Sequence, residues 1–171
     1  MPFDGNWSPR HVTPRGRALI KAFEGFMPST YICPAGHPTI CYGHVVLPGE
    51  TFAEPLAESA CEDLLVADLP RYERAVCRLI EVPLSDPCFD ALVSFAFNLG
   101  EGALQASTMR RMINADRLEE VGPQFDRWVF AGARKLPGLV ARRAAERAMW
   151  ESGLALPSTA PSVQPMPRRG W

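Results

Sequence analysis

The sequence predicts an α+β fold that is mainly helical, in which a small N-terminal lobe with a short antiparallel β-sheet is joined by a long helix to a helical lobe. Two observations support this class. Residues that favour strands cluster only between positions 30 and 47, where Pro and Gly interrupt them. Most of the remaining chain places apolar side chains at helical spacing. With 171 residues, 47% of them apolar, the chain is long enough to bury one core.

The first predicted helix begins at about Pro14 and ends at about Phe26. Thr13 suits the capping position and Pro14 suits the first helical position. Glu24 lies near the C-terminal end of this helix, shortly before Pro28 interrupts the chain. The apolar face of the helix consists of Ala18, Leu19, Ala22, Phe23 and Phe26.

The segment that follows predicts an irregular antiparallel hairpin or a three-stranded sheet. Its strand-forming residues are Tyr31, Ile32, Thr39, Ile40, Tyr42, Val45 and Val46. The residues that interrupt it are Pro34, Gly36, Pro38 and Gly43. We expect no second sheet, since no other segment combines these residue types.

The rest of the chain predicts helices. The long connecting helix is expected to begin at Thr51, in a capping box with Glu54, and to reach about Ile80 with a kink at Pro70. The next helix is expected from Ser85 to Gly100, with a buried stripe formed by Ala91, Leu92, Phe95, Ala96 and Leu99. Shorter helices are expected over residues 107–114, 116–130 (disturbed at Gly122-Pro123) and 137–151.

These elements predict one folded domain over residues 13–153, whose β-containing lobe covers about 24–55. Residues 1–12 are expected to form a polar tail and residues 154–171 a Pro-rich tail. Arg168 and Arg169 in the second tail could touch an anionic outer membrane, or the tail could be an end without function.

The charge balance does not indicate whole-chain attraction to nucleic acid or to an anionic membrane, because 18 basic and 19 acidic residues give a net charge of −1. No apolar stretch reaches the length of about 18 residues that a membrane span requires. The N-terminal residues lack the apolar segment of a secretory signal. We therefore expect the protein to stay in the cytoplasm until another factor releases it.

The chain has five cysteines, Cys33, Cys41, Cys61, Cys77 and Cys88. An odd number in a chain without a secretory signal favours free thiols over a disulfide framework. Cys61, Cys77 and Cys88 lie among apolar residues in helical segments, so we interpret them as small buried hydrophobic residues.

Glu24, Cys33 and Thr39 are the best candidates for a chemical role. A hairpin folded over the end of the first helix would bring all three to one cleft. Glycoside hydrolysis needs a carboxylic acid that protonates the leaving oxygen, and a second group that directs water or stabilises the cation. The apolar neighbours Phe23 and Phe26 could desolvate the Glu24 carboxyl and keep it protonated. Taken alone, Glu24 also fits a solvated residue at a helix end.

The spacing of these residues resembles a known signature. Eight residues separate Glu24 from Cys33, and five separate Cys33 from Thr39. The segments FEGF, TICYGH, FDALVSFAFNLGEGAL, STMRRMINA, FDRWVFAG and LPGLVARRAAERAMWESG follow in the matching order. Over about residues 14–153 the chain resembles the phage-type lysozyme (endolysin) family, which includes the T-even phage lysozyme.

The resemblance implies a lysozyme-like fold and a muramidase that hydrolyses the β-1,4 bond between N-acetylmuramic acid and N-acetylglucosamine in peptidoglycan. It implies Glu24 as general acid, with Cys33 and Thr39 positioning water or stabilising the transition state in an inverting reaction. It implies no cofactor, no metal and a monomer. It also implies that the enzyme is held in the host cytoplasm, then released through a holin-type pore to the periplasm and cell wall, where it lyses the host.

Two positions depart from the family pattern. Cys41 replaces a Gly of the hairpin, so the backbone there lacks the conformational freedom of Gly. Cys33 replaces the commoner Asp, and a thiol with an ordinary pKa of about 8.5 is mostly uncharged at neutral pH unless a nearby group favours the thiolate. Cys33 could instead attack the sugar carbon as a nucleophile, which predicts retention of the anomeric configuration.

The resemblance also implies supporting residues. Arg142 matches an arginine that pairs with the catalytic Glu, although Arg143 could be the true partner. Asn98 matches an amide that faces the cleft, although it could equally cap a helix before Gly100. His44 matches a histidine that pairs with an aspartate, here Asp68, in a structural role.

Three alternatives come from other classes. The close spacing of Cys33, His37, Cys41 and His44 could hold Zn²⁺ in a small binding module. A Cys–His hydrolase could use Cys33 with His37 or His44. A wall-binding protein could keep the lysozyme fold without activity.

Overall fold

The structure, a computed structural model, describes residues 10–155. Arg168 and Arg169 of the predicted C-terminal tail lie outside the described residues. In chain order the elements are α1 (Pro14–Glu24), β1 (Met27–Ile32), β2 (Pro38–Cys41), β3 (His44–Val45), α2 (Glu58–Leu79), α3 (Asp86–Leu99), α4 (Glu101–Ala106), α5 (Thr108–Asn114), the 3-10 helix η1 (Leu118–Glu120), α6 (Gly122–Phe125), β4 (Phe130–Ala131), β5 (Arg134–Lys135) and α7 (Pro137–Leu154).

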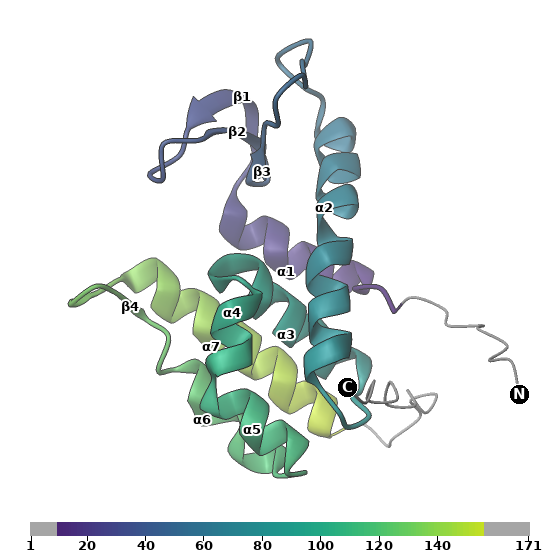
Figure 1. The fold of residues 1–171 in the computed structure, drawn as a ribbon, viewed down its shortest axis with the longest axis vertical. Coiled ribbons are helices and arrows are strands. Elements are labelled where there is room, and N and C mark those ends of the chain that lie inside the picture. Colours follow the sequence, from purple (N-terminus) through teal and green to yellow (C-terminus); the bar gives the residue numbers. More distant parts are fainter. Residues whose placement is uncertain (1–9, 156–171) are drawn as a thin grey trace, which may run out of the picture.

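The strands β1–β3 lie at one end of the molecule and helices α3–α7 at the other, with α2 running between them (Figure 1). This arrangement confirms the predicted α+β class, which is mainly helical with a small antiparallel sheet. None of the described helices is both long and apolar enough to cross a membrane.

Helix α1 begins as predicted, with the Thr13 hydroxyl accepting a hydrogen bond from the Gly16 N–H at 3.3 Å. It ends at Glu24, two residues before the predicted end. Gly25 follows with φ of 76°, a left-handed value that glycine adopts at little cost and that turns the chain out of the helix. Phe26 therefore leaves the apolar face and is 42% exposed.

The residues just before α1 pack against the helical lobe. Val12 is 2% exposed, and its N–H donates to Glu73 Oε1 at 2.8 Å. Arg10 Nη2 pairs with Asp86 Oδ1 at 2.9 Å. Residues 10–12 of the predicted polar tail thus pack against the helical lobe, because the Val12 N–H and the Arg10 side chain contact carboxylates that are distant in sequence.

The sheet has the strand order β1-β2-β3, with both pairs antiparallel. Tyr31 pairs with Thr39, and Ile40 pairs with His44. A register shift between Met27 and Tyr31 makes β1 irregular. Of the two predicted alternatives, a hairpin or a three-stranded sheet, the structure has the three-stranded sheet.

Helix α2 connects the two lobes, but it begins at Glu58 and not at Thr51. The predicted capping box is wrong because Glu54 accepts a hydrogen bond from the Thr30 N–H of β1 at 2.9 Å. The Leu56 N–H donates to Pro28 O at 2.8 Å, which ties the same loop to the sheet. Pro70 lies inside the helix, as predicted.

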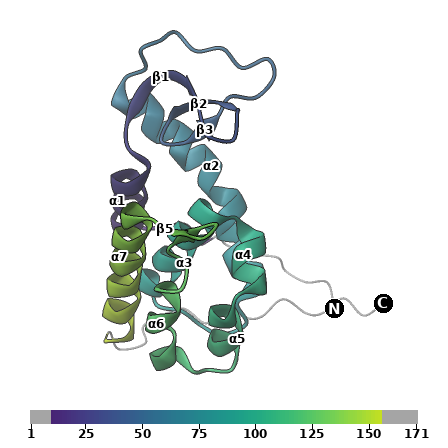
Figure 2. The same cartoon turned by 90° about the vertical axis from the view of Figure 1, so that its left-hand side faces the viewer.

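Helix α3 is the centre of the helical lobe, between α7 on one side and α4 and α5 on the other (Figure 2). Every residue from 87 to 96 is buried, so α3 is enclosed on all sides and not along one stripe. Helix α7 extends slightly beyond the predicted end at residue 151.

The structure contains a second, two-stranded sheet formed by β4 and β5, which the sequence did not predict. Each strand has two residues, too few for an alternating pattern to be visible. The helix predicted over residues 116–130 is also wrong. It is replaced by η1 and α6, and the disturbance predicted at Gly122-Pro123 is the start of α6, where Pro123 lies in the first turn.

Cys41 of β2 and Cys61 of α2 form a disulfide, with 5.0 Å between their Cα atoms. The expectation of free thiols is therefore wrong for these two residues. An odd number of cysteines does not show which of them the fold brings together. Five cysteines can form one disulfide and leave three free thiols. Cys88 is buried as predicted and Cys77 is half-buried, while Cys33 keeps a free thiol.

We expect removal of this disulfide to lower the free energy of unfolding by about 3 kcal/mol, because the bond closes a loop with a sequence separation of 20 in the unfolded chain. Urea unfolding of the oxidised protein, the reduced protein and a Cys41→Gly/Cys61→Ala variant would measure the change. Cys77→Ala is the matched control, since it removes a thiol that is not paired. Equal urea midpoints for the oxidised and reduced proteins would contradict the prediction.

Candidate active site

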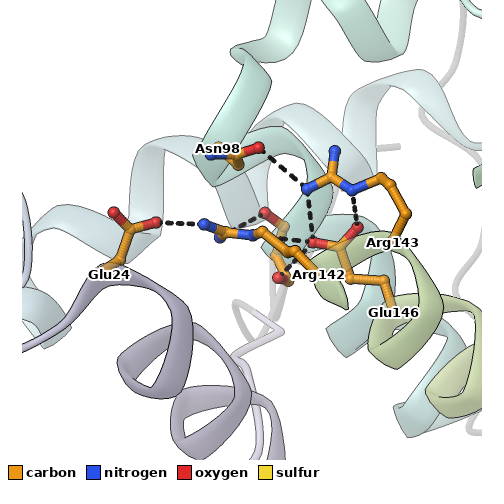
Figure 3. A network of polar contacts seen from close by, with 6 residues as sticks. Glu24, Asn98, Arg142, Arg143 and Glu146 are labelled. Atoms are coloured by element: carbon orange, nitrogen blue, oxygen red, sulfur yellow. Dashed lines mark hydrogen bonds and ion pairs between the residues drawn. The ribbon is translucent and has the colours of Figure 1, made fainter. Parts of the chain in front are cut away.

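Glu24 is the last residue of α1, and its carboxylate points toward α7 (Figure 3). Arg142 Nη1 donates to Glu24 Oε1 at 2.6 Å. On the side of the sheet, a Cβ added at Gly43 would lie 3.3 Å from Glu24 Oε2, and Gly43 has φ of 85°. Glycine at position 43 therefore allows the turn before β3 and leaves room for the carboxylate.

The Arg142 guanidinium is 3% exposed and uses all three of its nitrogens. In addition to the Glu24 contact, Nη2 donates to Ser94 O at 3.2 Å and Nε donates to Glu146 Oε1 at 3.2 Å. Arg143 points elsewhere: its Nη2 donates to Asn98 Oδ1 at 3.0 Å. Of the two arginines considered from the sequence, Arg142 is therefore the partner of Glu24.

A cavity of about 270 Å³ opens beside Glu24. It is lined by Glu24, Gly43, His44, Val45, Leu47, Asp68, Arg71, Tyr72, Phe97 and Asn98. Aromatic surface, carboxylates and an amide together suit a ligand with polar groups and an apolar face. A larger cavity of about 620 Å³ lies between α1 and α2, but it contains none of the predicted site residues.

Asn98 lines the cavity near the end of α3, and its side-chain oxygen is held by Arg143. The helix cap is Gly100, whose N–H donates to Ala96 O. The position of Asn98 thus fits the predicted amide that faces the cleft better than the alternative of a helix cap.

Cys33 follows β1 and Thr39 lies in β2, so the hairpin brings these two residues together. A hydrogen bond from the Thr39 hydroxyl, with help from the backbone at His37, lowers the pKa of the Cys33 thiol below its ordinary value. The same hydroxyl lies 3.0 Å from His37 O. It has one proton and can donate it either to that carbonyl or to the sulfur.

Tyr31 connects this pair to Glu24. Burial raises the pKa of Tyr31, and negative charge on Cys33 and on Glu24 raises it further. Both groups therefore lie within electrostatic reach of one tyrosine of β1. Cys33 and Thr39 do not line the cavity beside Glu24, so their convergence with Glu24 on one cleft stays a prediction.

His44 is buried and both of its ring nitrogens contact carboxylates, Nδ1 to Asp68 at 2.9 Å and Nε2 to Glu50 at 3.1 Å. Burial lowers its pKa, but the hydrogen bonds to Asp68 and Glu50 outweigh burial, so the pKa of His44 is raised above its ordinary value. The predicted pair of His44 and Asp68 is present and joins β3 to α2.

The charge on His44 should make stability depend on pH. Because the folded pKa is raised, this contribution is fully present below the unfolded pKa of about 6.5 and is lost as pH rises through the folded pKa. We expect Asp68→Asn to lower the free energy of unfolding by about 1–3 kcal/mol at about pH 5.5, and by less at about pH 8.5. Urea unfolding at both pH values tests this, with Asp63→Asn on the same helix as control. A loss that is equal at both pH values would exclude a role for the charge.

The alternative of a zinc site is not supported. Cys41 is bound in the disulfide, and no cluster of three or more His, Cys, Asp and Glu within residues 10–155 could hold a metal. The alternative of a Cys–His hydrolase is not supported by the contacts of the histidines. His44 faces two carboxylates, and the contact between Cys33 and His37 is a backbone hydrogen bond of 3.0 Å.

Comparison with protein families agrees with this geometry. The model of the family described as phage lysozyme matches residues 21–146. The chain belongs to the phage lysozyme family. The matched residues contain Glu24, the hairpin with Cys33 and Thr39, and the Arg142 network.

Known phage lysozyme relatives cover most of the chain. The endolysin of Bacillus phage B103 is 34% identical over 148 residues, which are 84% of this chain and 55% of that protein. The SAR-endolysin of bacteriophage PS119 is 35% identical over 127 residues, 72% of this chain and 74% of that protein. The structure of the muramidase domain of SpmX from Asticaccaulis excentricus has a TM-score of 0.75 and 34% identity, and covers 82% of this chain and 97% of that chain. The chain thus spans about half the length of the Bacillus phage endolysins.

The sequence pattern did not point to Glu146, although this residue contacts Arg142 and Arg143. A signal was available, because Glu146 lies four residues after Arg142 and four before Trp150 on one helix face. A charged residue in line with a tryptophan of the core indicates a buried ion pair. That spacing does not show which arginine Glu146 contacts.

Proposed function

We propose that this phage lysozyme family member is a muramidase that hydrolyses the β-1,4 bond between N-acetylmuramic acid and N-acetylglucosamine in peptidoglycan. The observation that carries this proposal is the placement of Glu24. An otherwise ordinary glutamate at a helix end borders a cavity with aromatic and polar walls, and a buried arginine fixes its orientation. Glycoside hydrolysis requires a carboxyl group held in this way next to the bond to be broken.

In the proposed mechanism Glu24 gives its proton to the leaving glycosidic oxygen. Cys33, which follows β1, and Thr39 of β2 direct the attacking water or stabilise positive charge that develops at the sugar carbon. The lowered pKa of Cys33 favours a thiolate that could do either. Water attack from the face opposite the leaving group would invert the anomeric configuration.

Digestion of purified peptidoglycan tests the proposal. A muramidase leaves new reducing ends on N-acetylmuramic acid, which borohydride converts to muramitol that mass spectrometry identifies. New ends on N-acetylglucosamine would assign a different glycosidic bond, and new amino groups would assign a peptidase or amidase. Binding to peptidoglycan without new ends would favour the alternative of a wall-binding protein without activity.

Release through a holin-type pore and action as a monomer remain predictions. If release depends on such a pore, expression in a bacterial host should cause lysis only together with a pore protein. Lysis by the chain alone would show another route to the wall. Size-exclusion chromatography with light scattering would measure the oligomeric state.

A further inference from the structure

Beside Glu24 lies a group of charged side chains that the proposed reaction does not use directly. Arg142, Arg143 and Glu146 of α7 are 3%, 0% and 0% exposed (Figure 3). Burying charges costs free energy unless each is paired and hydrogen-bonded. Each of these three is paired, and the set reaches Glu24 on one side and Asn98 on the other.

Glu146 is the central residue of this group. Its Oε1 accepts hydrogen bonds from Ser94 Oγ at 2.7 Å, Arg143 Nη2 at 3.1 Å and Arg142 Nε at 3.2 Å. Its Oε2 lies 2.9 Å from Arg143 Nε as an ion pair, although the orientation there is not that of a hydrogen bond. Glu146 therefore contacts both arginines and is anchored to α3.

These contacts set the charge that Glu24 faces. Burial raises the pKa of the Glu146 carboxyl, while Arg143, Arg142 and the Ser94 hydroxyl oppose that effect. At a pH where Glu146 is ionised, two positive side chains and one negative side chain leave one net positive charge in the group. Burial lowers the pKa of Arg143, while Glu146 and Glu24 oppose that effect, so Arg143 lies within electrostatic reach of Glu24. Without the Glu146 charge, Glu24 would face two positive charges. Arg142 would also be repelled by Arg143, and its Nε would donate to a neutral oxygen in place of a carboxylate.

We propose that Glu146 is a positioning residue: by neutralising Arg143 and holding Arg142 Nε, it sets the direction of the Arg142 guanidinium and the net positive charge beside Glu24. This inference rests on the proposed function, because it takes Glu24 as the proton donor. A second positive charge beside a carboxyl group favours the ionised carboxylate, which has no proton to donate. Glu146 thus extends the pH range in which Glu24 can act as an acid.

The other charged and titratable groups near Glu24 belong to the small lobe and α2. Burial and Glu24 both raise the pKa values of Tyr31 and Tyr72, so these tyrosines stay neutral in the acidic and neutral range. The remaining ones are Cys33, His44, Asp68 and Arg71. The variants described below change none of these groups. A difference between variants in the pH–rate profile or in the titration of Glu24 therefore comes from the charges of Arg143 and Glu146 on α7.

Glu146→Gln is the first test, because it keeps the shape of the side chain and removes its charge. We expect the alkaline limb of the pH–rate profile, where the proton donor becomes ionised, to move down by about one pH unit. We expect kcat to fall by about 10-fold or more, with KM changed less than about threefold, since the cavity walls are intact. A merely structural role would lower stability and leave the position of the limb unchanged.

Arg143→Gln supplies the opposite change, because it lowers the net charge beside Glu24. The alkaline limb of the pH–rate profile should then move to higher pH by a similar amount. The double variant Arg143→Gln/Glu146→Gln restores one net positive charge, and its limb should return close to the wild-type position. If Glu146→Gln does not fold, the single Arg143 variant and the double variant still carry the test.

Carbon-13 NMR titration of the Glu24 carboxyl in the whole protein gives a readout that does not require activity. Glu151→Gln is the matched control, since it removes a carboxylate from the exposed ion pair with Arg147 on the same helix. Opposite shifts for the two single variants, none for the control and recovery in the double variant are expected. An unmoved Glu24 titration in both single variants would overturn the inference. Opposite shifts of the Glu24 titration in the two single variants, together with peptidoglycan left intact by the wild-type protein, would refute the proposed function alone.

Discussion

Glu24→Gln is expected to reduce the rate of peptidoglycan cleavage by about 100-fold to 10,000-fold. Glutamine keeps the shape of the side chain and an oxygen that can accept the hydrogen bond from Arg142, but it has no proton to give to the leaving oxygen. The cavity walls are unchanged, so KM should change little. Initial rates of reducing-end formation over a range of peptidoglycan concentrations would separate the two parameters.

Glu119→Gln provides the control for this experiment, because Glu119 is an exposed glutamate in η1 and does not border the cavity. It should cleave at the wild-type rate. Circular dichroism and urea unfolding would show that Glu24→Gln is folded. A folded Glu24→Gln protein with nearly wild-type activity would refute the assignment of Glu24 as general acid, whatever bond is cut.

Replacement of Cys33 should have the second-largest effect. Cys33→Ala removes the group that faces the Thr39 hydroxyl, and we expect cleavage to slow by about 10-fold to 1,000-fold. Cys33→Asp places a carboxylate, the commoner residue in the resemblance, at the same point, and should retain much more activity than alanine. Cys77→Ala is the control, because that half-buried thiol lies outside the site.

The stereochemistry of the product distinguishes the two roles of Cys33. Proton NMR of the first products formed shows whether the new reducing end is α or β before mutarotation mixes them. Inversion agrees with a thiol that directs water, and retention agrees with a thiol that attacks the sugar carbon. Wild-type activity of Cys33→Ala would exclude both roles and leave water positioning to Thr39 alone.

The local pattern of the chain was enough to predict several elements and candidate residues. Thr13 and Pro14 mark the start of α1, and the run of apolar residues between Ser85 and Gly100 marks α3, because capping and helical periodicity depend on near neighbours. The same holds for the sheet, where β-branched residues alternate with Pro and Gly. Glu24, Cys33 and Thr39 became candidates through their spacing. In the structure Thr39 is the register partner of Tyr31, and the charges on Cys33 and Glu24 raise the pKa of that tyrosine.

Other features depend on contacts between residues far apart in the chain, so local pattern could not predict them. Glu54 bonds to Thr30 and does not cap a helix, since the sheet offers it backbone and hydroxyl donors. The disulfide between Cys41 and Cys61 depends on the packing of β2 against α2, which the number of cysteines does not reveal.

The arginine contact of Glu24 is the clearest example of what the sequence predicts and what depends on tertiary contacts. The resemblance that the sequence carries predicted that Arg142 or Arg143 would accompany Glu24. Only the tertiary structure decided that Arg142 makes this contact and that Arg143 donates to Asn98. It also decided that Glu146 accepts hydrogen bonds from both arginines. The physical reason is that neighbouring residues on a helix point in different directions. The packing of α7 against α1 and α3 therefore determines which residues each side chain contacts.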